Sequence, residues 1–219
     1  MGNVVDPAAT FKATFTPDSS NYKTVENVEV TVTVSKAAPT VTAPTAKMLT
    51  YTGTAQELVN AGSATGGTMY YAVTTENTAP TDDNLYTTSI PSKTDAGTYY
   101  VWYRVAGDGN HYDSDPACIT AEIKKAEATV TAKEQTIKEG TGIGTGTDKA
   151  ELSGQVSGHS LSAVTLAAED GKIVPSGAVI RDAGNKDVTG NYNISYQPGA
   201  LTVIPRTSYL VTFRVINGA

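Results

Sequence analysis

The sequence predicts an all-β protein, and composition, alternation and turn residues all contribute to that prediction. Of its 219 residues, 39% are hydrophobic and only 17% are charged, which suits short strands better than long amphipathic helices. Apolar and polar side chains alternate with the two-residue period of β-strands in several segments, and clusters of Gly, Pro, Asn and Asp separate those segments.

The densest run of strand-forming and aromatic residues is 94–105, TDAGTYYVWYRV. Alternation predicts one core-facing set and one surface-facing set of side chains, which are Tyr99, Val101, Tyr103 and Val105 for the core and Tyr100, Trp102 and Arg104 for the surface. Asp95, Gly97 and Tyr99 have the spacing of a tyrosine corner, in which a buried Tyr hydroxyl bonds to the upstream backbone. The run therefore predicts the penultimate strand of an immunoglobulin-like sandwich.

The chain repeats itself with a period of one such sandwich. Asp6 and Asp95 are 89 positions apart, and so are Lys36 and Lys125, which both end a predicted strand. Two landmarks that flank a hairpin and share one offset indicate tandem modules. The sequence therefore predicts tandem immunoglobulin-like β-sandwich modules.

Four regions follow from this repeat. Residues 1–36 are predicted to be the last two strands of a truncated preceding module, one in the stretch 6–15 and the other, half-buried, at 28–34. Residues 37–126 and 127–205 are predicted to be complete modules, and 206–219 the first strand of a following one. Because a lone hairpin is marginal, residues 1–36 are expected to be mobile, to associate with another copy, or to pair with Tyr209–Ile216.

Within 37–126, strands are expected near 40–43, on both sides of a turn at Gly53, at 68–73, at 99–105 and at 119–123. Within 127–205, they are expected at 128–132, 162–167, 178–180, 192–196 and 201–204. Pro198-Gly199 places a fixed φ before a permissive one, so we expect a type II turn that joins the last two strands as a hairpin.

Three features resemble the mostly bacterial Ig-like (MBG-type) repeats of secreted or wall-anchored surface proteins: DAGTYYV, the Lys-Ala strand ends, and DVTGNYNISYQPGALTV at 187–203. Residues 1–126 resemble a related Ig-like repeat, and 209–218 resembles the opening strand of a third repeat type. The resemblance implies a stalk or adhesin segment on the bacterial cell surface, with neighbouring modules of the same polypeptide as partners and with no shared catalytic residues.

Composition argues against several other classes of protein. A net charge of −6 and a pI near 4.9 give no basic stripe for nucleic acid, and no apolar run is long enough to insert in a membrane. The single cysteine, Cys118, cannot form an intrachain disulfide and is expected to face outward or lie at a sheet end.

Few residues could carry chemistry. The two histidines, His111 and His159, lack metal-site or nucleophile spacing and are expected to be solvated loop residues, so we expect no enzyme activity and no cofactor. Asp108, Asp113 and Asp115 crowd one loop and are the candidates for a calcium site, although acidic turn residues commonly serve as caps. No lysine and carboxamide pair for an isopeptide bond can be matched from the sequence.

The surface face of the 94–105 strand offers a binding hypothesis, because Tyr100 and Trp102 with Tyr70 could stack on a sugar ring or a peptide. The competing expectation is that a loop or a neighbouring module covers them. Our leading interpretation is a non-catalytic structural or adhesive segment that acts as a stalk or spacer. The alternatives are a carbohydrate- or peptide-binding module with a host or glycan ligand, and an accessory region of a larger extracellular hydrolase.

Overall fold

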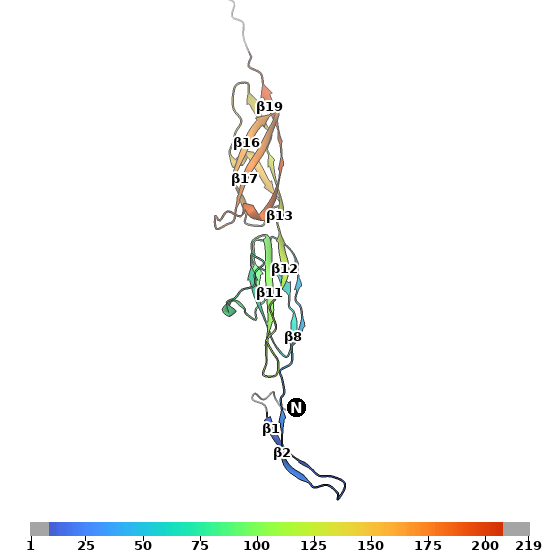
Figure 1. Cartoon of the computed structure of the whole chain (residues 1–219). Helices are drawn as coiled ribbons and strands as arrows, with labels where there is room; N and C mark the ends of the chain where they lie inside the picture. The colour runs from blue at the N-terminus through green and yellow to red at the C-terminus, as the bar shows by residue number, and fades with distance from the viewer. Residues whose placement is uncertain (1–8, 208–219) are drawn as a thin grey trace, which may run out of the picture. The chain divides into compact units, whose positions relative to one another are not determined.

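The computed structural model describes residues 9–207, and these residues confirm the all-β prediction (Figure 1). The helical segments within that range are three single turns of 3-10 helix: η1 (Asp83–Leu85), η2 (Thr147–Lys149) and η3 (Thr189–Asn191). None of the described helices is long and apolar enough to cross a membrane. The predicted strand at Tyr209–Ile216 lies outside the described residues.

The described residues pack as two compact units. Unit 1 consists of residues 9–49, 55–93 and 98–122, and unit 2 of residues 50–54, 94–97 and 123–207. Two short segments from within the region predicted as one module, 50–54 and 94–97, thus pack as part of unit 2. The module boundaries expected from the repeat stay predictions.

Strands β1 (Ala9–Phe15) and β2 (Val25–Val32) form the expected antiparallel hairpin in unit 1, with Phe11 opposite Val30. The register shifts by one residue between Ala13 and Phe15, next to Asn27, whose φ of 57° is typical of a bulge. The prediction that the second strand is half-buried is wrong. All of β2 is exposed, because no other described element covers its apolar side.

The main sheet of unit 1 has the strand order β5-β12-β11-β9. These strands are β5 (Met48–Thr50), β12 (Ala117–Lys124), β11 (Gly97–Gly107) and β9 (Gly67–Thr74). Three two-stranded sheets accompany it: β3 (Thr40–Thr42) with β8 (Ser63–Thr65), β4 (Thr45–Ala46) with β7 (Val59–Asn60), and β6 (Gln56–Glu57) with β10 (Ser92–Lys93).

The inner face of β11 is core, as predicted. Tyr99, Val101 and Val105 are buried, and Tyr103 is half-buried. Fully buried side chains from the short strands and their links, including Leu58 and Val59, also belong to the core of unit 1. The backbone bond expected of the Tyr99 hydroxyl stays a prediction.

Two sheets make up most of unit 2. One has the order β15-β13-β18, from β15 (Ala150–Ser153), β13 (Ala126–Ala132) and β18 (Tyr192–Gln197). The other has the order β14-β19-β17-β16, from β14 (Gln135–Lys138), β19 (Gly199–Ile204), β17 (Lys172–Arg181) and β16 (Ser160–Glu169). Val130 of the first sheet and Ala178 of the second lie in one buried cluster, so the two sheets share a core.

The prediction of a hairpin at Pro198-Gly199 is wrong. β18 pairs in parallel with β13 in one sheet, and β19 pairs in parallel with β14 in the other, so the chain passes from sheet to sheet at Pro198. Paired residues are 66 positions apart in the sequence in both ladders. The segments 126–138 and 192–204 therefore change sheets together and keep their register. Gly199 is needed for close packing rather than for a positive φ, because a Cβ there would collide with the carbonyl oxygens of Ala132 and Lys133.

This crossing generates a stability prediction. Gly199→Ala is expected to lower the free energy of unfolding by about 1–3 kcal/mol, because the added methyl group overpacks against backbone that cannot move without breaking the ladder. Gly190→Ala is the matched control, since no atom lies within 4 Å of its Cβ position. Urea denaturation measures both variants, and an equal loss of stability in the two would contradict the explanation.

Candidate functional site

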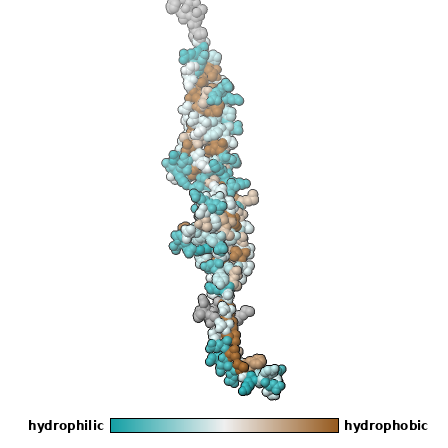
Figure 2. All heavy atoms as spheres, viewed as in Figure 1, coloured by the Kyte–Doolittle hydropathy of each residue, from teal (hydrophilic) through white to brown (hydrophobic). Residues whose placement is uncertain are grey.

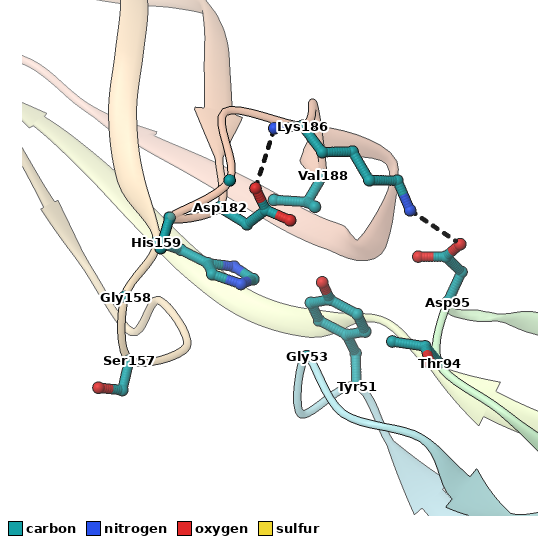
Figure 3. A pocket seen from close by; sticks show the side chains of 12 residues that line it. Tyr51, Gly53, Thr94, Asp95, Ser157, Gly158, His159, Asp182, Lys186 and Val188 are labelled. Carbon is teal, nitrogen blue, oxygen red and sulfur yellow. Dashed lines mark hydrogen bonds and ion pairs between the residues drawn. The ribbon is translucent and has the colours of Figure 1, made fainter.

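A cavity of about 220 Å³ lies within unit 2 (Figure 3). Its lining comes from segments far apart in the sequence: Tyr51, Gly53, Thr94, Asp95, Ser157, Gly158, His159, Asp182, Ala183, Gly184, Lys186 and Val188. Two carboxylates, one ammonium and two aromatic rings therefore converge on one small space. This is the strongest candidate for a functional site in the described residues.

Tyr51 forms one wall of the cavity. The residue follows β5, and its backbone N–H donates to the carbonyl of Lys124 at 2.8 Å. Its ring meets Tyr192 edge-on at 5.6 Å and His159 at a tilt at 5.9 Å, centroid to centroid. Burial raises the pKa of the Tyr51 phenol, and a hydrogen bond with the side chain of Asn191 opposes that shift. These edge-on and tilted contacts are the favourable geometries for aromatic rings.

His159 is held by Tyr192, which contradicts the expectation that it is a solvated loop residue. The Tyr192 hydroxyl accepts from the backbone N–H of Val156 at 3.0 Å and lies 2.6 Å from His159 Nδ1. The hydroxyl oxygen can accept a second hydrogen bond or donate its proton, so the tautomer of His159 decides which of the two groups is the donor. The half-buried imidazole therefore ties the 156–159 turn to β18.

Asn191 is the one buried polar residue of the part of the chain that the structure describes, and it connects three segments of the site. Its Oδ1 accepts from the backbone N–H of Ala96 at 2.7 Å, and its Nδ2 donates to Asp95 Oδ1 at 2.9 Å. It also bonds the side chain of Tyr51. A buried amide is costly unless its groups are paired, so these bonds make Asn191 a structural anchor for the 94–97 segment.

The charged groups at the rim are largely engaged with one another. Lys186 Nζ lies 3.4 Å from Asp95 Oδ2, and both side chains are more than half exposed, so this ion pair adds little stability. The backbone N–H of Lys186 donates to Asp182 Oδ1 at 2.9 Å and closes the turn after β17 (Figure 3). Within residues 9–207, no group of three or more His, Cys, Asp or Glu side chains could hold a metal ion.

The predicted aromatic residues Tyr70, Tyr100 and Trp102 share one face of the β9–β11 sheet and are all half-buried. The Trp102 indole N–H donates to Thr74 Oγ1 at 3.0 Å within that face. The set Tyr100, Trp102 and Arg104, predicted to lie on the surface, is partly exposed and partly covered. The guanidinium of Arg104 pairs with Asp83 at 2.7 Å and lies over the ring of Tyr86 at 4.4 Å.

Tyr86 covers the Arg104 end of this face. It belongs to the loop that follows β9, it is only 5% exposed, and burial raises the pKa of its phenol. The loop returns to the sheet edge where Thr87 and Tyr71 exchange two backbone hydrogen bonds, at 2.6 and 2.8 Å. Cys118, expected to face outward or to lie at a sheet end, is half-buried, and burial raises the pKa of its thiol.

The three calcium candidates serve as turn residues in the structure. Asp108 accepts from the backbone N–H of Asn110 at 2.8 Å and lies 2.6 Å from His111 Nδ1, and the bond to His111 is the main cause that lowers the pKa of Asp108. Asp113 accepts from the backbone N–H of Gly107 at 2.8 Å. Asp115 contributes its carbonyl oxygen to Ser114, so the structure does not bring the three carboxylates together as ligands.

Sequence reasoning did not single out the residues that form the core of the site, Tyr51 and Asn191. Neither belongs to a motif with catalytic or ligand spacing, and Asn191 is 96 positions from its partner Asp95. No protein-family model matches the chain, and the comparison with curated proteins finds no match either. The geometry of the site, with its paired and mutually bonded side chains, is therefore the basis for assigning a role.

Removing the Asn191 side chain tests its role as an anchor. Asn191→Ala is expected to lower the free energy of unfolding by about 1–3 kcal/mol, because it leaves the Ala96 N–H without its acceptor. Asn193→Ala is the matched control, since Asn193 is exposed and donates only to Glu127. Chemical denaturation provides the measurement, and equal stability of the two variants would contradict the anchoring role.

Because of Tyr51, the free energy of unfolding should depend on pH in the alkaline range. Its phenol has a folded-state pKa above the ordinary value of 10.0, so the stability it contributes is complete below pH 10 and is lost as pH rises through the folded-state pKa. Tyr51→Phe is expected to flatten the fall of the unfolding free energy above pH 10, whereas Tyr112→Phe, at an exposed position, leaves it unchanged. Denaturation series at several pH values measure the slopes, and an unaltered slope for Tyr51→Phe would contradict this expectation.

Proposed function

We propose that this chain is a non-catalytic spacer, a segment of tandem immunoglobulin-like β-sandwich modules in a bacterial cell-surface protein. In this role it holds an adhesive part of the same polypeptide away from the surface. The observation that carries the proposal is the link between the units' main strands: β12 ends at Lys124 and β13 begins at Ala126, so a single residue joins two strands that belong to different sheets.

A one-residue link suits a spacer because short, ordered connections allow less bending than Gly- or Ser-rich linkers.

The pairing of the charged and polar side chains around the cavity also supports the proposal. Asn191, Asp95 and Lys186 are bonded to one another or to backbone, and the cavity is smaller than the roughly 300–1,000 Å³ typical of small-molecule sites. On the aromatic face, the polar end of Trp102 is already bonded to Thr74. Both places are better suited to holding the fold together than to holding a ligand.

The immunoglobulin-like and MBG-type assignments are part of the proposal. Two sheets around one core in unit 2 support a sandwich, and the stretch DVTGNYNISYQPGALTV covers η3, β18 and most of β19. These elements contain Asn191, Tyr192 and Gly199, which respectively anchor a loop, hold the half-buried His159 and permit the sheet crossing. The stretch 187–203, on which the resemblance rests, therefore contains three residues that each stabilise a different part of the structure.

Replacement in the full-length surface protein tests the spacer role. Exchanging residues 37–205 for an unrelated stiff domain pair of similar length is expected to preserve adhesion of cells that carry the protein, whereas deleting the segment is expected to reduce it. A second experiment compares the binding of the wild type and of Trp102→Ala to a glycan array. Loss of adhesion on exchange, together with loss of glycan-array binding by Trp102→Ala, would instead support the carbohydrate-binding alternative.

A further inference from the structure

The main sheet of unit 1 has an edge that is open next to Val73. β9 is the last strand of this sheet, and at its outer edge Tyr71 exchanges two backbone hydrogen bonds with Thr87. Backbone groups of alternate residues point to the same side of a strand, so the N–H and C=O of Val73 point to the same edge as those of Tyr71. Within residues 9–207, no backbone group pairs with Val73 on that side.

The open position at Val73 follows from the path of the loop after β9. If the antiparallel register of Thr87 with Tyr71 continued, Leu85 would lie opposite Val73. Leu85 instead belongs to η1, where its N–H donates to the carbonyl of Asp82 at 3.1 Å. The loop therefore leaves the sheet one pair short of Val73, and the open edge is a feature of the fold of unit 1 itself.

A groove of about 430 Å³ lies beside this edge. Its volume is within the roughly 300–1,000 Å³ of typical binding clefts. Strand β9, the loop that follows it and strand β10 of a second sheet provide the lining, which consists of Val73, Thr74, Thr75, Glu76, Thr78 and Lys93. The groove therefore combines an unpaired strand edge with polar and charged side chains.

The two charged residues of the groove are not neutralised by ion pairs. The ammonium of Lys93 lies over the ring of Tyr99, 5.8 Å from its centroid, and no carboxylate pairs with it in the part of the chain that the structure describes. The same holds for Glu76 on the loop wall. The half-buried ammonium of Lys93 therefore favours a carboxylate from outside the chain, since a charge-assisted bond is stronger than a neutral one.

We propose that this edge binds an extended peptide, which adds a short strand to β9 and directs an acidic side chain to Lys93. An extended peptide offers one N–H and one C=O at the spacing that Val73 presents, and this is how peptides join open sheet edges. Recognition of a peptide here is additional to the spacer role and does not depend on it.

The face on which Val73 lies determines where the acidic residue belongs. Val73 is paired with Val101, which is fully buried, so the side chain of Val73 lies on the core face of the sheet. A peptide residue opposite Val73 would point to that same face, and Lys93 lies on that side over the buried ring of Tyr99. Glu76 disfavours a polyacidic peptide, so we expect one acidic residue with a basic residue nearby.

The contact is short, so binding should be weak. Val73 supplies one pair of backbone hydrogen bonds and Lys93 one ion pair. We therefore expect a dissociation constant between about 10 μM and 1 mM.

Selection from a phage library of random linear seven-residue peptides, with the whole chain as target, provides the probe. A selected peptide, synthesised free, is expected to contain an acidic residue and to shift the NMR amide signals of Val73 and Thr75. Lys93→Glu is expected to weaken its binding by at least about tenfold, because repulsion replaces attraction. Lys23→Glu is the matched control, since it makes the same charge change at an exposed lysine of unit 1 outside the groove.

Two changes in the peptide separate recognition from a folding defect of Lys93→Glu. Replacing the acidic residue of the peptide by Lys is expected to weaken binding to the wild type and to restore binding to Lys93→Glu. N-methylation is expected to weaken binding most at the position opposite Val73 and little at its two neighbours, whose N–H groups point away from β9. A library without a binder, equal affinity of Lys93→Glu and Lys23→Glu, no rescue by the Lys peptide, or an equal effect of N-methylation at every position would each overturn the proposal.

Discussion

Unit 2 depends on two parallel ladders, one in each of its sheets, that keep the same register. β13 and β14 pair with β18 and β19 at a constant offset of 66 residues, although both chain segments change sheets partway. A one-residue slip would turn every side chain of these strands to the opposite face, so Val130 and the shared core fix the register. The crossing at Gly199 is possible because no side chain stands between it and the backbone of Ala132.

Side-chain hydrogen bonds to backbone groups support both units in a chain whose single cysteine cannot form an intrachain disulfide. Three tyrosine hydroxyls accept from backbone N–H groups: Tyr71 from Gly62, Tyr192 from Val156 and Tyr196 from Ala178. Asn191 does the same for Ala96 through its amide oxygen. Each bond satisfies a backbone N–H donor, and the bonds from Gly62, Val156 and Ala96 each fix a loop at one point.

The cavity and the β1–β2 hairpin differ in the environment of their side chains. In the cavity, carboxylate, amide and ammonium groups pair with one another, and this pairing favours a structural role. On the β1–β2 hairpin, the larger apolar side chains are exposed within the described residues (Figure 2).

The sequence alone determined the all-β class, the positions of most strands and the inner face of β11, because two-residue alternation at Tyr99, Val101 and Val105 reports directly which side is buried. Only the tertiary structure decided which strands pair and which distant residues meet. Pro198-Gly199 is compatible with a hairpin or a sheet crossing, and close approach to Ala132 selects the crossing. Asn191 has no local signal, because its role comes from partners that folding brings from the 51 and 95 regions of the chain.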